Sequence, residues 1–143
     1  MDALQPGHAL CGRRILVVDD NRDAADSLAM ILRYAGADVR VVYDGFDALD
    51  AMPGCSPDIV LLDIGMPGLN GCDLARTIRS NPVHRNVLLV ALTGWGQAAD
   101  RLRSHEAGID HHLVKPVDFE VLQELLLATP APRDPSIQAT TNQ

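Results

Sequence analysis

Several side chains suited to phosphate or metal chemistry stand directly after short apolar runs of the sequence. They are Asp19, Asp20, Asp63, Thr93 and Lys115. Three are carboxylates, one is a hydroxyl and one is an ammonium group. A single Asp after a strand is usually a turn residue or a helix N-cap. The pattern therefore carries weight because all five groups occupy the same kind of position.

These positions converge if the apolar runs are parallel strands. In open parallel sheets, ligands bind outside the carboxyl ends of the strands, so residues far apart in sequence meet in one crevice. Three neighbouring carboxylates raise one another's proton affinity, and Mg²⁺ with oxygen ligands relieves that repulsion while leaving room for phosphate oxygens. A Lys and a Thr could then neutralise a transferring phosphoryl group, and an aspartate could form an acyl phosphate.

The strands that must position these groups are predicted from hydrophobic patterning. Continuous apolar runs at 15–18, 59–62 and 87–92 indicate strands buried on both faces. The runs at 39–43 and 111–114 include polar side chains. Edge strands tolerate polar residues better, so we expect these two at the edges of the sheet.

Helical patterns fill the gaps between these runs. Apolar residues at helical spacing predict helices around 28–35, 46–52, 74–78 and 122–126, with a weaker one at about 96–107. The second is marked by Phe46, Leu49 and Met52. Five strands alternating with five helices predict a doubly wound α/β fold with a five-stranded parallel sheet.

Composition and charge limit the function classes. The 143 residues include 12 Lys and Arg against 19 Asp and Glu, a formal charge of −7, so nucleic acid is not an expected partner. No apolar run approaches the roughly 20 residues of a membrane span, and no secretory signal is visible. The three cysteines lack a CxxC pair. We therefore expect a cytoplasmic protein with reduced thiols.

The domain is predicted to occupy residues 13–128. Residues 1–12 lack periodicity and are expected to form a tail. Residues 129–143 contain three prolines followed by polar residues, which is typical of a disordered tail or a linker. The stretch after Lys115 is too short for a DNA-binding or enzymatic output domain, so the expected output is a protein contact, or it resides elsewhere if this chain is a fragment.

Four motifs resemble those of receiver domains of bacterial two-component response regulators, the family of the chemotaxis response regulator. They are the acidic pair Asp19-Asp20, the D-x-x-M-P-x-x-x-G segment 63–71, the hydroxyl motif Ala91-Leu92-Thr93-Gly94 and the lysine motif Leu113-Val114-Lys115-Pro116. The resemblance covers about 13–128 and implies a flavodoxin-like fold of strand order 2-1-3-4-5.

The resemblance also implies a phosphoacceptor and a metal site. Asp63 would accept a phosphoryl group from a histidine kinase or a histidine phosphotransfer protein. Mg²⁺ would be bound by Asp19, Asp20, Asp63 and the backbone carbonyl of Gly65. The chain would then be a phosphorelay component rather than an enzyme, although it could slowly remove its own phosphoryl group.

A switch is implied around the phosphoryl group. Thr93 would hydrogen-bond a phosphoryl oxygen, Lys115 would pair with the group, and Pro116 would follow across a cis peptide bond. Many receivers have Tyr or Phe three residues before the lysine, whereas this chain has His112. Thr93 and His112 are thus the predicted switch residues, and an imidazole can titrate near neutral pH as well as change rotamer. Residues 92–97 and 108–118 are also similar to receivers of hybrid histidine kinases.

Three other interpretations compete. Phosphatases of the haloacid-dehalogenase type need D-x-D after the first strand, but the window here is Asp19-Asp20-Asn21. A flavodoxin-like FMN carrier would need a phosphate loop after that strand and aromatic residues, which are scarce. A receiver that acts as an unphosphorylated scaffold would lack one of the key residues, and none is missing.

Overall fold

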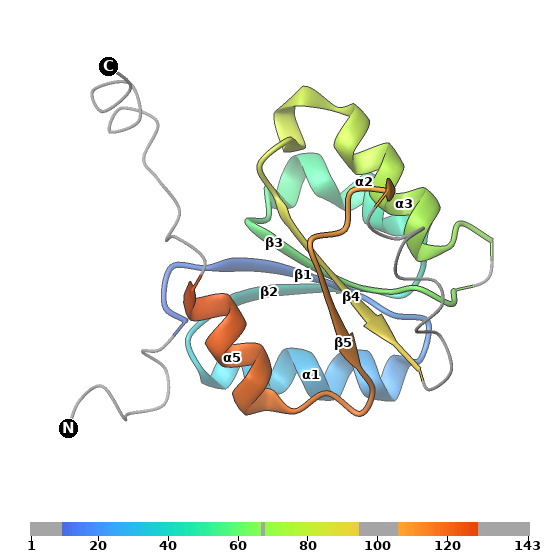
Figure 1. Ribbon diagram of the computed structural model, residues 1–143. Coiled ribbons are helices and arrows are strands. Elements are labelled where there is room, and N and C mark those ends of the chain that lie inside the picture. Colours follow the sequence, from blue (N-terminus) through green and yellow to red (C-terminus); the bar gives the residue numbers. More distant parts are fainter. Residues whose placement is uncertain (1–9, 67, 95–105, 129–143) are drawn as a thin grey trace, which may run out of the picture.

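A five-stranded parallel sheet forms the centre of the computed structural model, which describes residues 10–66, 68–94 and 106–128 (Figure 1). Its strands are β1 (Arg14–Val18), β2 (Asp38–Val42), β3 (Ile59–Asp63), β4 (Leu88–Thr93) and β5 (His111–Val114). They are arranged in the order β2-β1-β3-β4-β5, with all neighbours parallel. This confirms the predicted order and the two predicted edge strands.

Helices cover both faces of the sheet, which confirms a doubly wound, flavodoxin-like fold. Helices α1 (Arg22–Tyr34) and α5 (Phe119–Ala128) lie on one face, and α2 (Gly45–Cys55) and α3 (Gly71–Ser80) lie on the other (Figure 1). The short 3-10 helix η2 (Pro82–His84) connects α3 to β4. The fourth expected helix, about 96–107, falls almost wholly outside the described residues, as do 129–143 and most of 1–12.

The helices that follow β1, β2 and β3 each begin at a polar cap. The Asn21 side chain accepts a hydrogen bond from the backbone N–H of Ala24 at 3.1 Å. In the same way, the Asp44 side chain accepts from the N–H of Asp47 at 2.7 Å, and the Asn70 side chain accepts from the N–H of Asp73 at 2.9 Å. Each cap satisfies one of the N–H groups that a helix start leaves without an intrahelical partner. These caps set where α1, α2 and α3 begin, close to the carboxyl ends of the strands.

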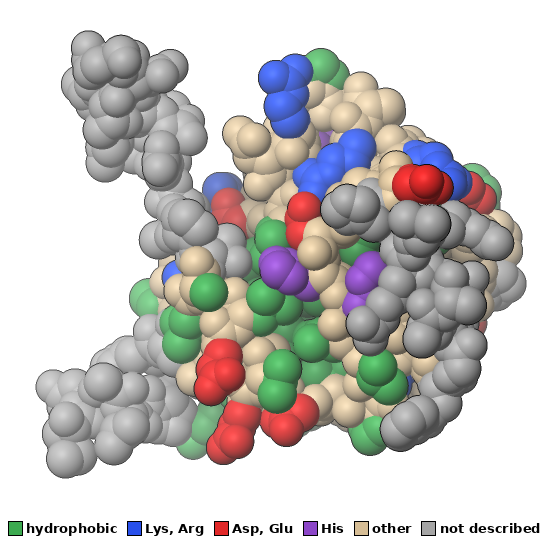
Figure 2. Space-filling model, in the orientation of Figure 1, with side chains coloured by type: hydrophobic (Ala, Val, Ile, Leu, Met, Phe, Trp, Pro, Cys, Tyr) green, Lys and Arg blue, Asp and Glu red, His purple; other side chains and the backbone are tan. Residues whose placement is uncertain are grey.

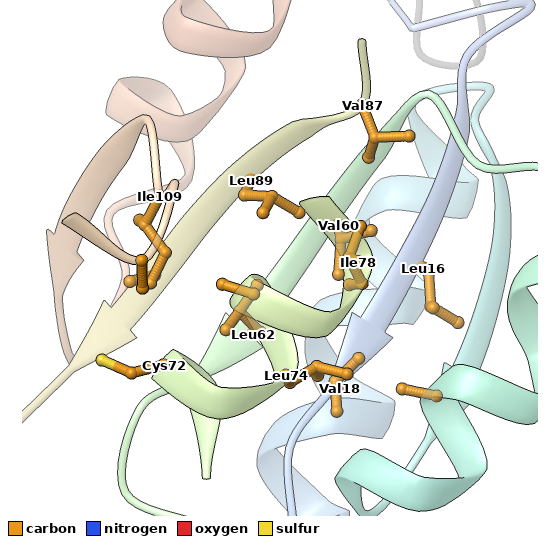
Figure 3. Packing of buried hydrophobic residues seen from close by; sticks show 14 of the residues in the cluster. Leu16, Val18, Val60, Leu62, Cys72, Leu74, Ile78, Val87, Leu89 and Ile109 are labelled. Atoms are coloured by element: carbon orange, nitrogen blue, oxygen red, sulfur yellow. The ribbon is translucent and has the colours of Figure 1, made fainter. Parts of the chain in front are cut away.

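Strand residues alternate between two apolar clusters. Those that face α2 and α3 are Leu16, Val18, Val60, Leu62, Leu89 and Ala91, several of which are labelled in Figure 3. Those that face α1 and α5 are Ile15, Val17, Ile59, Leu61, Val90 and Leu92. Nearly all are fully buried, and burial of such a side chain contributes about 1.5–3 kcal/mol. The well-packed sheet therefore holds the ends of β1, β3 and β4 in fixed relative positions.

Charge is unevenly distributed over the surface. On the face drawn in Figure 2, Lys and Arg side chains gather over α3 and its connection to β4, while Asp and Glu side chains gather over α5. None of the helices in the described parts of the chain is long and apolar enough to cross a lipid bilayer.

Candidate functional site

The polar residues predicted at the strand ends lie together at one edge of the sheet. Asp63 is the last residue of β3 and pairs with Leu92 of β4, directly before Thr93. The Asp19 N–H donates to the carbonyl of Val42 at 3.3 Å, and the Lys115 N–H donates to the carbonyl of Thr93 at 2.7 Å. Backbone pairing thus extends past the strands and fixes where these side chains start.

Three carboxylates form an acidic cluster at this edge. Oxygens of Asp19, Asp20 and Asp63 all lie within 4.8 Å of one another. Asp19 is 2% exposed, Asp63 is partly buried and Asp20 is exposed. Within the described residues Asp20 makes no ion pair. A set of hard oxygen donors with one open side fits a divalent cation such as Mg²⁺, which commonly keeps several waters.

Backbone donors orient two of these carboxylates. The Asn21 N–H donates to Asp19 Oδ1, and the Gly65 N–H donates to Asp63 Oδ1, both at 3.0 Å. The second oxygens lie toward Lys115: its Nζ is 2.9 Å from Asp19 Oδ2 and 3.4 Å from Asp63 Oδ2. Each of the two carboxylates therefore has one oxygen held by the main chain and one paired with an ammonium group.

Lys115 is the cation that balances this cluster. Burial of its ammonium group lowers the pKa, but the hydrogen bond to Asp19 and the charges of Asp63 and Asp19 outweigh burial, so the pKa of Lys115 is raised above its ordinary value. Lys115 is therefore firmly charged at neutral pH. The Lys115–Pro116 peptide bond is cis, as the resemblance implied.

The two predicted switch residues lie on the neighbouring strands β4 and β5. Thr93 is 5% exposed, and its hydroxyl donates to the carbonyl of Leu113 at 3.5 Å, a length at which a hydrogen bond is weak. A stronger acceptor near Asp63 could therefore draw this hydroxyl away. His112 is half-buried on β5 opposite Ala91, whereas His111 is exposed.

Gly71 has a structural role that sequence reasoning did not predict. A Cβ atom at this position would lie 2.7 Å from the carbonyl oxygen of Asp63 and 2.8 Å from the Cα of Ile64. Both are backbone atoms, which cannot rotate away. The absence of a side chain lets the start of α3 pack directly against the end of β3. The signal was present as the final glycine of the 63–71 motif, but its cause is visible only in three dimensions.

Comparison with known proteins identifies the family. The family model described as response regulator receiver domain matches residues 15–127. The DNA-binding response regulator MtrA of Mycobacterium tuberculosis is 40% identical over 104 residues, which are 73% of this chain and 44% of that protein. The response regulator MprA of Mycobacterium avium is 38% identical over 109 residues, 76% of this chain and 47% of that protein. This chain thus spans less than half the length of these relatives.

Solved structures agree with this fold. The crystal structure of a "putative response regulator" from Chloroflexus aurantiacus is 29% identical and has a TM-score of 0.73. The match covers 82% of this chain and 99% of that one. The receiver domain of a histidine kinase from Syntrophus aciditrophicus is 29% identical with a TM-score of 0.72, covering 85% and 97%. The chemotaxis protein CheY4 of Vibrio cholerae shares the fold, with a TM-score of 0.78 at 24% identity. That match covers 82% of this chain and 98% of the other. This chain belongs to the response regulator receiver domain family.

Proposed function

We propose that this chain is the phosphoacceptor of a two-component phosphorelay and that Asp63 receives the phosphoryl group. The observation that carries the proposal is the pairing of Asp63 on both of its oxygens. One accepts the Gly65 N–H and the other lies 3.4 Å from the Lys115 ammonium. A carboxylate held in this way presents a fixed nucleophile beside a cation, and phosphoryl transfer depends mainly on positioning and charge neutralisation.

In the proposed reaction a carboxylate oxygen of Asp63 forms a P–O bond while the P–N bond of a phosphohistidine breaks. The electron pair of the broken bond leaves with the imidazole nitrogen. Asp19, Asp20, Asp63 and the Gly65 carbonyl would hold Mg²⁺, which when bound supplies positive charge to the phosphoryl oxygens. Lys115 already lies between Asp19 and Asp63, so it needs only a small shift to pair with the phosphoryl group.

The proposal includes a switch on β4 and β5. The weak Thr93 hydrogen bond to Leu113 can be replaced by one to a phosphoryl oxygen, which is a better acceptor. That exchange releases the Leu113 carbonyl beside His112. Phosphorylation would thereby shift the equilibrium between two arrangements of this face of the sheet.

The partners follow from the same chemistry. The proposed donor is a histidine kinase or a histidine phosphotransfer protein, in the cytoplasm, and the proposed output is a contact with a protein partner. We propose 13–128 as the receiver unit and 129–143 as a tail. Leu10, in the expected N-terminal tail, also packs with this unit: it is fully buried, and its N–H donates to the carbonyl of Ala35 at 2.9 Å. DNA binding is part of the name of the relative MtrA, of which this chain matches less than half.

Treatment with acetyl phosphate and Mg²⁺ tests the proposal directly. Intact-mass measurement should show one added phosphoryl group on the wild type and none on Asp63→Asn. Asp58→Asn is a matched control, because Asp58 also borders β3 but pairs with Arg14 at the opposite end of that strand, and it should label like the wild type. Absence of the added mass from the wild type would favour an unphosphorylated scaffold, and equal labelling of Asp63→Asn would refute the assigned residue.

A further inference from the structure

A single arginine ties three separate segments together at the end of the sheet opposite Asp63. Arg79 lies near the end of α3. Its Nε donates to the carbonyl of Gly108 at 2.9 Å, and its Nη1 donates to the carbonyls of Arg85 and Val87 at 2.9 and 2.6 Å. Its Nη2 pairs with Asp110 Oδ2 at 2.6 Å. The guanidinium thus joins α3, the approach to β4 and the approach to β5.

The partner carboxylate joins this contact to the sheet. Asp110 Oδ2 also accepts the Leu89 N–H at 2.9 Å, and the Asp110 N–H donates to the Leu89 carbonyl at 2.8 Å. Leu89 and Asp110 stand one residue before the first residue pair of the β4–β5 ladder, Val90 with His111. The ion pair between Arg79 and Asp110 therefore lies at the N-terminal end of the β4–β5 ladder, where the register of the two strands begins.

The Arg79 side chain packs closely against the backbone of Gly108. Gly108 has a φ of +100°, and a Cβ at this position would lie 2.6 Å from Arg79 Cγ. An open surface pocket of about 620 Å³ lies beside the contact and is lined by Arg79, Arg85, Gly108, Asp110 and His111 among others. Ala107 and Ile109 are buried, but apolar packing is non-directional. The directional anchoring of this segment comes from the hydrogen bonds.

The alignment of β5 decides where Lys115 lies. The same pairing runs from Val90 with His111 to Thr93 with Val114 and continues in the bond from the Lys115 N–H to the Thr93 carbonyl. A shift by one residue would move Lys115 by about 3.3 Å along the strand and turn each β5 side chain to the other face. The distance from Lys115 Nζ to Asp63 Oδ2 is 3.4 Å, so such a movement would separate the pair.

We propose that Arg79 is a positioning residue for Lys115, which it holds at the phosphoacceptor by fixing the alignment of β5 on β4 from the opposite end of the sheet. This inference rests on the proposed function of Asp63 and Lys115. Its signature is a defect specific to Lys115 that leaves the carboxylates of the Mg²⁺ site in place, because Asp63 ends β3 and Asp19 and Asp20 follow β1.

The test is a double-mutant cycle on the rate of phosphorylation by acetyl phosphate. Arg79→Gln should lower the rate roughly three- to tenfold in the wild-type background and have no further effect in a Lys115→Gln background. The Mg²⁺ dissociation constant should not rise, because the three carboxylates stay in place and a displaced Lys115 no longer offsets their charge. Arg76→Gln is the matched control and should leave the rate unchanged. Arg76 lies on the same helix, and its one ion pair among the described residues, with Asp73, is exposed.

A second variant and a second readout keep the test decisive. Gly108→Ala displaces the Arg79 side chain and should reproduce the defect of Arg79→Gln. Amide exchange of Lys115 should accelerate in Arg79→Gln but not in Arg76→Gln, since it reports the β4–β5 ladder without any phosphoryl group. Equal effects of Arg79→Gln in both backgrounds, or unchanged Lys115 exchange, would overturn the inference. A wild type that accepts no phosphoryl group would refute the proposed function instead, and the exchange measurement would still decide whether Arg79 anchors β5.

Discussion

Replacement of Asp20 by Asn should stabilise the protein without Mg²⁺ and weaken its response to Mg²⁺. Asp20 is exposed and lies within 4.8 Å of both other carboxylates of the cluster. At that separation two unit charges repel by about 0.9 kcal/mol in water and about 3.5 kcal/mol at an effective dielectric constant of about 20. Because Asp20 is exposed, its repulsion from each of the other two carboxylates lies near the lower of these energies.

Other charges reduce the expected effect. Attraction from the more distant Lys115 and screening by salt offset part of the repulsion, which leaves a gain of about 1 kcal/mol for Asp20→Asn. For a domain of this size the gain corresponds to a rise in melting temperature of about 3–5 °C. With Mg²⁺ at about a hundred times its dissociation constant, the wild type gains about 2.7 kcal/mol, more than the variant. The order of the two melting temperatures should therefore reverse.

Thermal unfolding at low ionic strength, with EDTA or with saturating Mg²⁺, measures both effects. Asp23→Asn is the control, because it removes the same charge from the first turn of α1, outside the cluster. It should lose a favourable interaction of about 0.3–1 kcal/mol with the helix dipole and keep the wild-type response to Mg²⁺. A lower melting temperature of Asp20→Asn in EDTA, or an equal Mg²⁺ response in Asp20→Asn and wild type, would refute the reasoning.

Three further predictions concern other residues of the site. Because the pKa of Lys115 is raised in the folded protein, the charged ammonium stabilises the fold fully below the unfolded-state pKa of about 10.4, and this stabilisation is lost as pH rises through the folded-state pKa. The free energy of urea unfolding of the wild type should therefore approach that of Lys115→Gln above the folded-state pKa. A difference between the two proteins that stays constant with pH would contradict this. Gly71→Ala should cost about 1–3 kcal/mol in the same assay, because its Cβ meets the Asp63 backbone; unchanged stability would disprove the close approach. Beryllofluoride should alter amide exchange in residues 111–114 of the wild type and much less in Thr93→Ala, whereas equal changes would rule out transmission through that hydroxyl.

The strands were predictable because burial on both faces leaves a simple pattern. The continuous runs at 15–18 and 59–62 became β1 and β3, whose residues alternate between the two clusters. Helix starts were harder to predict. Helix α1 begins at Arg22, well before the expected 28, because its first turn is defined by the Asn21 cap and not by apolar residues.

Side-chain burial was less predictable within the helices. Phe46 marks the apolar pattern of α2, yet it is 61% exposed. The residues of α2 that face the sheet are mainly small: Ala48 and Ala51 are buried with Met52. Counting apolar residues at helical spacing gives no weight to size, and close packing of a helix on a sheet favours the smaller ones.

The candidate site was predictable as a set of residues, and its charge balance was not. Strand-end positions and motif spacing identified Asp19, Asp63 and Lys115. That the Lys115 ammonium pairs with both carboxylates depends on side-chain geometry. Arg79 escaped prediction for a related reason: its acceptors come from segments that only the fold brings together.

Phosphorylation by phosphoimidazole, a small analogue of phosphohistidine, tests the central claim most directly. Peptide mass mapping of the product locates the phosphoryl group on the chain. We expect Mg²⁺-dependent addition of one group, located at Asp63. A group located at Asp19 or Asp20, or one that persists in Asp63→Asn, would contradict the account.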